Sequence, residues 1–175
     1  MPTPDRTSLD EIVAAGRDLI EQGGSSRLTM QAVADRVGVR APSLYKRVRD
    51  RDALLLLVAR ATADDLSERL EASDGTLAAL GHAYRAFALA RPEAFRLLFS
   101  VEGAVESLDR VSATVLSLGR ELVGQGEALE AARLITAWAT GFINMELAGA
   151  FRLGGDVDHA FDFGLERLEI GLRGG

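Results

Sequence analysis

Residues 29–48 have the sequence TMQAVADRVGVRAPSLYKRV and carry the clearest structural pattern in the chain. Two short helical segments flank Gly38, and Pro42 stands where the first turn of a helix tolerates proline. Two helices joined by a tight turn need a small residue at their contact, a residue that accepts a left-handed backbone at the turn, and an apolar anchor under the second helix. Ala34, Gly38 and Leu44 have these properties at these places. The segment therefore predicts a helical pair with a glycine turn.

The second helix of this pair is expected to expose a cationic face with small side chains. On the helical period, Leu44 and Val48 face inward. The residues that face outward are Arg40, Ala41, Ser43, Lys46 and Arg47. A helix with such a face fits the major groove of B-DNA. The spacing alone leaves one alternative open, a surface helical hairpin whose arginines are only solvated.

The remainder of the chain also has helical periodicity and shows no alternating strand pattern bounded by turn residues. A capping box at Ser8 and Glu11, caps at Thr29 and Asp50, and glycine or proline breaks mark the helix ends. These signals predict an all-α fold of about nine helices, in two lobes that share the fourth. The expected helices lie near residues 8–22, 29–37, 41–48, 51–72, 76–90, 92–99, 105–123, 127–153 and 156–172.

Charge is distributed unevenly along the sequence. The formal net charge is −6 at pH 7, yet residues 27–51 hold seven basic and two acidic side chains. From residue 52 onward there are eleven arginines and nineteen carboxylates. A basic segment on an acidic body can hold a polyanion with one part of the protein only. The charge pattern therefore favours a nucleic-acid partner for residues 27–51.

The residue inventory argues against several other kinds of site. Hydrophobic residues form 47% and charged residues 26% of the chain, as in an ordinary globular protein. Cysteine is absent, and the two histidines, His82 and His159, belong to no Glu-x-x-His pair. We therefore predict no enzymatic activity, no cofactor and no metal. The apolar run at residues 53–59 is too short to span a bilayer and no signal segment opens the chain, so we expect a cytoplasmic protein without a membrane partner.

The N-terminal part of the chain resembles the DNA-binding domain of TetR-family transcriptional regulators. The resemblance is carried by Leu28, Thr29, Ala34, Gly38, Val39, Pro42, Ser43, Leu44, Tyr45, Val48, Arg51, Ala53, Leu54 and Leu55. One departure is Arg47, which stands where the family commonly has a histidine and which keeps a donor for phosphate. The resemblance implies a helix-turn-helix DNA-binding domain over residues 1–50. It implies a regulatory domain for ligand binding and dimerisation over residues 51–175.

The resemblance also implies a set of contacts with DNA. Tyr45 and Arg47 would contact phosphates, and Thr29 stands at a helix N-terminus, where a backbone amide can hold a phosphate. Positions that can face base edges are occupied by Gln31, Arg40, Ala41, Pro42, Ser43 and Lys46. For Arg40, a phosphate contact or simple solvation is an equal alternative. Arg51 either pairs with a neighbouring aspartate or touches DNA.

The stretches 82–99 and 137–146 resemble one subset of the family's regulatory domains, with Thr140 where that subset often has a histidine. An aromatic set with a few polar groups is the pattern of a small-molecule pocket. The expected lining is Tyr84, Phe87, Phe95, Phe99, Trp138 and Phe142, with Asn144 or Glu146 as polar anchor and His82 and Arg85 as further polar candidates. For each aromatic residue, a place in an ordinary packed core is the alternative.

Small residues recur beside leucines in the last two expected helices. They let helices approach closely and predict an isologous interface between two copies, with packing inside one chain as the alternative. The complete hypothesis is a homodimeric repressor that leaves a palindromic operator in double-stranded DNA when a small apolar effector binds. The alternative function is a constitutive architectural DNA-binding protein without an effector.

Overall fold

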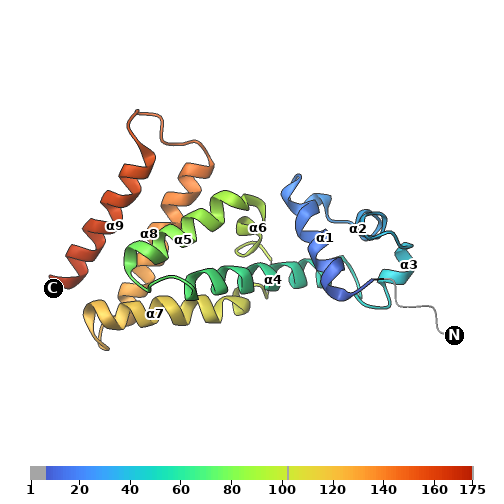
Figure 1. Ribbon diagram of the computed structural model, residues 1–175, viewed down its shortest axis with the longest axis horizontal. Helices are drawn as coiled ribbons and strands as arrows, with labels where there is room; N and C mark the ends of the chain where they lie inside the picture. The colour runs from blue at the N-terminus through green and yellow to red at the C-terminus, as the bar shows by residue number, and fades with distance from the viewer. Residues whose placement is uncertain (1–6, 102, 175) are drawn as a thin grey trace. The chain divides into compact units, whose positions relative to one another are not determined.

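The computed structural model describes residues 7–101 and 103–174, and all regular secondary structure in this part of the chain is helical (Figure 1). Nine α-helices and two short 3-10 helices are present in these residues. The α-helices are α1 (Leu9–Glu21), α2 (Met30–Val37), α3 (Ala41–Leu44), α4 (Arg51–Glu71), α5 (Leu77–Ala90), α6 (Pro92–Leu97), α7 (Asp109–Val123), α8 (Ala128–Leu147) and α9 (Val157–Arg173); the 3-10 helices are η1 (Ser25–Arg27) and η2 (Val105–Leu108). The predicted all-α class is confirmed. Within the described residues, no helix is both long and apolar enough to span a bilayer.

Local capping signals set the N-termini of several helices. The Ser8 hydroxyl accepts the amide of Glu11 at 3.1 Å, and the Glu11 carboxylate accepts the amide of Ser8 at 2.7 Å. The Asp50 carboxylate accepts the amide of Ala53 at 2.8 Å, and this bond lowers the pKa of Asp50. Such caps satisfy amides that lack partners in the first helical turn. The predicted starts of α1 and α4 follow from them.

The predicted end of the eighth helix was wrong. The sequence placed the end of the eighth helix at Gly154–Gly155, but α8 ends at Leu147. Gly149 has a φ of 63°, and the amides of Gly149 and Ala150 bond to the carbonyls of Glu146 and Met145 at 2.9 Å. A left-handed glycine with returning amides ends a helix. The connection to α9 is therefore longer than expected, and the pair Gly154–Gly155 lies within it.

The described chain forms two compact units. Unit 1 comprises residues up to Asp64 together with Arg91–Ser107, and unit 2 comprises Asp65–Ala90 and the residues from Leu108 onward. The division falls inside α4, which both units share, and it assigns α6 to unit 1. The compact units differ from the two domains predicted from the sequence, residues 1–50 and 51–175. That predicted division concerns DNA binding and regulation, and it stays a prediction.

Each unit has its own buried side chains. Those of unit 1 come from α1 to α4 and from the segment that contains α6: Ile12, Ile20, Leu28, Val33, Leu44, Val48, Leu54, Val58, Leu97 and Ala104. Those of unit 2 include Leu66, Leu77, Phe87, Ile143, Phe161 and Leu165. Burial of one such leucine or phenylalanine contributes about 1.5–3 kcal/mol. Unit 1 thus contains enough apolar surface to hold the short helices α2 and α3 in place.

Candidate nucleic-acid interface

The turn between α2 and α3 has the geometry that its sequence predicts. Gly38 lies in the left-handed region, with φ 74° and ψ 30°. The amide of Val39 bonds to the carbonyl of Ala34 at 2.9 Å, and Ala34 is fully buried. A residue with a Cβ would be strained at such a φ. Because Leu44 is buried as well, the three expected roles in this turn are all filled.

The candidate DNA-contacting side chains all belong to unit 1, on α2, α3, the adjoining turns and the first residue of α4. All but Ala41 and Arg51, which are half-buried, are exposed: Thr29, Gln31, Arg40, Pro42, Ser43, Tyr45, Lys46 and Arg47. Their counterparts Leu44 and Val48 point into the core. The amphipathic division of this segment therefore follows the prediction.

The helix α3 is shorter than its sequence pattern suggested. It ends at Leu44, and Tyr45 is its C-cap. The amides of Arg47 and Val48 both bond to the carbonyl of Leu44, at 2.8 and 2.9 Å. Lys46 and Arg47 therefore lie on a turn that follows the helix.

Among the candidate side chains, those of Gln31 and Arg51 donate hydrogen bonds within the protein. The Gln31 amide donates to the Asp35 carboxylate at 2.6 Å. The Arg51 guanidinium donates to the carbonyl of Leu28 at 2.8 Å and to that of Ser25 at 2.6 Å. These bonds hold the segment that enters α2. A contact between Arg51 and DNA stays a prediction. The observed bonds attach the start of α4 to the segment before α2, a role that the sequence did not indicate.

The sequence also missed the participation of α6 in unit 1. The Glu21 carboxylate accepts the amides of Ala94 at 2.8 Å and Glu93 at 3.4 Å. These partners are separated by more than 70 positions, so no local motif marks the contact. It joins the end of α1 to the start of α6.

The candidate effector-lining residues are not gathered in one unit. Phe95 and Phe99 belong to unit 1, where their rings form an edge contact at 5.4 Å. The remaining candidates lie in unit 2: Tyr84, Phe87, Trp138, Phe142, Asn144 and Glu146. The structure therefore divides the expected set. The pocket assignment of these residues stays a prediction.

In unit 2 the rings of Trp138, Phe142, Phe151 and Phe161 form one packed cluster. Trp138 stacks on Phe161 with ring centroids 5.3 Å apart, and Phe142 contacts Phe161 at 5.1 Å and Phe151 at 4.7 Å. Phe161 is fully buried, although its sequence position did not single it out. The indole of Trp138 lies against the backbone of Gly164, where a Cβ would be only 2.0 Å from Cζ2.

A buried arginine connects three helices of unit 2. The Arg85 side chain on α5 donates to both carboxylate oxygens of Glu146 on α8, at 2.7 and 2.6 Å, and to Asp158 on α9 at 2.7 Å. Its guanidinium also lies 5.0 Å from the centroid of Phe161. The bonds to Glu146, followed by those to Asp158, raise the pKa of Arg85. Glu146 is therefore committed to an internal partner.

The neighbouring residue on α5 makes a second polar contact in unit 2. The hydroxyls of Tyr84 and Thr140 are 2.9 Å apart. Burial raises the pKa of Tyr84 to about 12, so its hydroxyl is neutral at physiological pH. Thr140 thus supplies a hydrogen-bond partner for Tyr84 inside unit 2. Asn144, the other expected polar anchor, is exposed.

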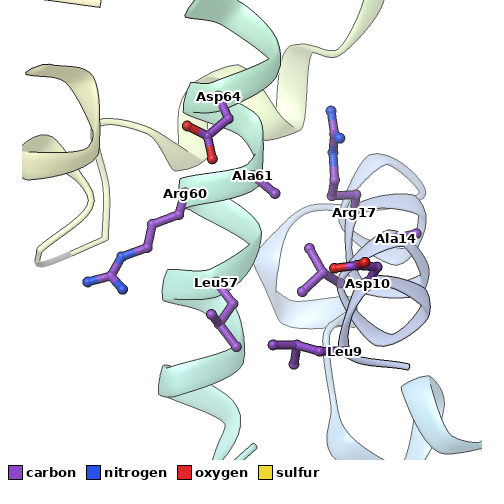
Figure 2. Close-up of a pocket in the computed structure, with 9 residues that line it drawn as sticks. Leu9, Asp10, Ala14, Arg17, Leu57, Arg60, Ala61 and Asp64 are labelled. Carbon is purple, nitrogen blue, oxygen red and sulfur yellow. The ribbon is translucent and has the colours of Figure 1, made fainter. Parts of the chain in front are cut away.

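An open groove of about 370 Å³ lies between α1 and α4 in unit 1 (Figure 2). Its apolar lining is Leu9, Val13, Ala14, Leu57 and Ala61, and its charged lining is Asp10, Arg17, Arg60 and Asp64. Figure 2 shows Leu9 directed toward α4 and Arg60 directed away from α1. None of the residues expected to bind an effector lines this groove.

A helical pair with an exposed basic face, held by a left-handed glycine turn, defines a helix-turn-helix DNA-binding regulator. Residues 12–58 match the family described as "Bacterial regulatory proteins, tetR family". Residues 77–168, more than half of the chain, match the family described as "Tetracyclin repressor-like, C-terminal domain". The chain therefore belongs to the TetR family of DNA-binding transcriptional regulators, which are not enzymes.

Solved structures share this fold. A protein with unknown function from Rhodococcus sp. RHA1 is 24% identical, with a TM-score of 0.83 over 99% of this chain and 100% of that one. A possible TetR family transcriptional regulator from Streptomyces coelicolor A3(2) is 24% identical, with a TM-score of 0.72 over 94% of this chain and 98% of that one. A variant of TetR from Acinetobacter baumannii AYE, solved in complex with minocycline, is 23% identical, with a TM-score of 0.67 over 94% and 96%. No curated protein matches the chain.

Proposed function

We propose that this chain is a cytoplasmic, homodimeric repressor that binds a palindromic operator and releases it when a small-molecule effector binds. Two α2–α3 pairs would enter successive major grooves, about one helical turn of DNA apart. The observation that carries the proposal is the division of the segment around α3. Leu44 and Val48 anchor it in the core, while the candidate contact residues are exposed on one unit.

The exposed residues suggest separate roles at DNA. Arg47 and Tyr45, on the turn after α3, are suited to phosphates, and the start of α2 at Thr29 offers backbone amides to a phosphate. Arg40 and Lys46 carry donors for guanine O6 and N7. Phosphate contacts position a protein on any duplex, whereas base contacts distinguish sequences. The two groups should therefore respond differently to substitution.

Replacement of Arg47 by alanine is expected to weaken binding to all duplexes alike, by about 1 kcal/mol or more, and to lower the slope of log affinity against log salt by about one. Tyr45→Phe should cost about 1 kcal/mol without changing the slope, since it removes an uncharged donor. The measurement is fluorescence anisotropy over a range of salt concentrations, with a duplex selected from a random pool. Arg120→Ala, an exposed arginine on α7 in unit 2, is the matched control. Unchanged affinity and slope in both test variants would contradict this docking mode.

The dimer is supported by apolar side chains left exposed on α8 and α9, which pack side by side in unit 2 (Figure 1). On α9 the inner residues Phe161 and Leu165 are buried, whereas Phe163 and Ile170 are 56% and 54% exposed. On α8, Leu134 and Met145 are about half exposed. Packing inside one chain thus buries one face of these helices. We propose that a second copy of the chain covers the apolar side chains on the other face.

The substitution Ile170→Glu is expected to weaken self-association at least about tenfold, because an unpaired carboxylate would enter an apolar interface. The folded protomer should tolerate it, since the side chain is exposed. Sedimentation over a range of protein concentrations measures the effect, and circular dichroism checks the fold. Leu89→Glu, also exposed but on α5, serves as the control. Equal association of the two variants would place the interface elsewhere.

The effector proposal rests on the aromatic and polar residues of unit 2, and the minocycline complex of the A. baumannii protein offers a precedent. The rival function, constitutive binding, is favoured by the ring-to-ring packing of Trp138 and Phe142 on Phe161 and by the commitment of Glu146 to Arg85. A compound screen that follows both Trp138 emission and duplex affinity separates the two. A compound that changes both supports an effector, while duplex affinity that no compound alters supports constitutive binding.

A further inference from the structure

Asp35 places a negative charge among the residues proposed to contact DNA. Residues 27–51 hold two acidic side chains, Asp35 and Asp50. The carboxylate of Asp50 caps α4 by accepting the amide of Ala53. Asp35 is exposed in the last turn of α2, where a carboxylate faces the negative end of the helix dipole. A charge of this sign also opposes the attraction of DNA phosphates. Neither the helix dipole nor general DNA affinity therefore favours a carboxylate at this position.

The side chain of Asp35 forms a hydrogen bond with that of Gln31, one turn earlier on α2. Nε2 of Gln31 donates to Oδ1 of Asp35 at 2.6 Å. A carboxylate only accepts hydrogen bonds, whereas an amide has a nitrogen with two hydrogens and an oxygen that accepts. The amide nitrogen therefore has to face Asp35, since the reversed amide would bring two acceptors together. This orientation leaves Oε1 and the second hydrogen of Nε2 for another partner.

An amide held in this way matches the major-groove edge of adenine. Adenine presents its N6 amino group as a donor and N7 as an acceptor, and glutamine can pair with both at once. Oε1 of Gln31 would accept from N6, and the second hydrogen of Nε2 would go to N7. Guanine presents two acceptors, O6 and N7, so its O6 would oppose Oε1. A glutamine that is able to reverse its amide avoids this conflict, because its nitrogen then faces guanine O6.

We propose that Asp35 is a positioning residue for sequence recognition. It holds the amide of Gln31 with Oε1 outward, so that Gln31 selects adenine over guanine. The inference rests on the proposed function, since it requires that α2 lie against a base edge. The other role open to this pair is a hydrogen bond between positions i and i+4 that stabilises α2. Stabilisation of α2 alone makes no distinction between bases, so base preference separates the two roles.

The test measures how tightly the full-length protein binds duplexes that differ at one base pair in each half of the operator. A duplex selected from a random pool is changed position by position, each base pair together with its symmetry mate. Affinities are measured by fluorescence anisotropy at one salt concentration. Gln31→Ala marks the position that Gln31 contacts, because the preference there is lost in this variant. At that position the unchanged protein should bind adenine about tenfold or more tighter than guanine.

Asp35→Asn is the variant that tests the orientation of the amide. An asparagine side chain both donates and accepts, so it permits either orientation of the Gln31 amide. The preference for adenine over guanine should fall to about threefold or less at that one position, while preferences at other positions persist. Affinity for every duplex should rise, because a negative charge near the phosphates is removed. Since preference is a ratio of affinities for one protein sample, partial unfolding of a variant does not alter it.

Two further variants complete the comparison. Asp18→Asn also removes an exposed carboxylate from unit 1, together with its ion pair with Arg36 on α2. It should leave the adenine preference intact, because the bond between Gln31 and Asp35 remains. Asp35→Glu keeps a carboxylate, which only accepts, on a longer side chain and should retain most of the preference.

Each contrary result has a distinct meaning. If Asp35→Asn leaves the adenine preference unchanged, Asp35 only stabilises α2 and the positioning role is overturned. If Gln31→Ala alters no preference, or if the unchanged protein prefers guanine at the position that Gln31 contacts, the positioning role is overturned while DNA binding stands. If the unchanged protein binds no duplex from the pool, the proposed function fails and the positioning role with it.

Discussion

Replacement of Arg85 by methionine is expected to lower the free energy of unfolding by about 3–5 kcal/mol, because removal of one partner leaves the other with an uncompensated charge in a buried place. Arg85 is 7% exposed and Glu146 is largely enclosed, with two hydrogen bonds between them. Asp158, whose side chain is 80% exposed, should contribute little, since water can replace its partner. Urea denaturation followed by circular dichroism measures the loss.

Two further variants show whether the buried pair causes this loss. Arg167→Met breaks an exposed ion pair with Glu166 and should change the free energy of unfolding by about 1 kcal/mol at most. The double change Arg85→Met with Glu146→Leu should recover much of the lost stability, because no buried charge is then left unpaired. If Arg85→Met has the same free energy of unfolding as the unchanged protein, the pair of Arg85 and Glu146 does not stabilise unit 2.

The second large effect is expected at Gly164 on α9. A methyl group there would lie 2.0 Å from Cζ2 and 2.7 Å from Cη2 of Trp138, so the indole must leave its place on Phe161. Gly164→Ala should therefore lower the free energy of unfolding by about 2–3 kcal/mol, as overpacking of a core does. The emission of Trp138, the only tryptophan, should shift as its ring becomes more exposed.

Gly171→Ala is the matched control on the same helix, because nothing lies within 4 Å of a Cβ at Gly171. Alanine has the higher helix propensity, so this change should raise the stability by up to about 1 kcal/mol. Both variants are compared at one protein concentration, since α9 is also the proposed dimer helix. Changes of opposite sign in the free energy of unfolding at the two glycines support the packing described for Trp138. Equal changes would contradict it.

The helix-turn-helix segment was predictable because its signals are local. Gly38 meets a backbone requirement within its own turn, and Leu44 and Val48 are separated by one helical turn. Caps such as Ser8 with Glu11 likewise act over three residues. Interactions of this range are encoded in neighbouring residues and need no knowledge of the rest of the fold.

The end of α8 was harder to predict because the sequence offers two sets of glycines. Gly149 and the pair Gly154–Gly155 can each stop a helix, and helical periodicity continues past the first of them. In the folded protein, Phe151 packs on Phe142 at 4.7 Å. This contact requires the chain to turn back after Leu147, so tertiary packing selects the earlier stop.

The sequence by itself determined the all-α class, the N-terminal caps, the glycine turn and the exposed basic face, since each depends on residues a few positions apart. Only the tertiary structure decided that α6, with Phe95 and Phe99, belongs to unit 1 while the other aromatic candidates belong to unit 2, and that Glu146 binds Arg85. An aromatic or charged residue at helical spacing indicates which face of its helix is apolar or charged. It does not indicate which distant side chain that residue contacts. That choice depends on how helices far apart in the sequence pack, because burial and ion pairing are satisfied only once those helices are brought together.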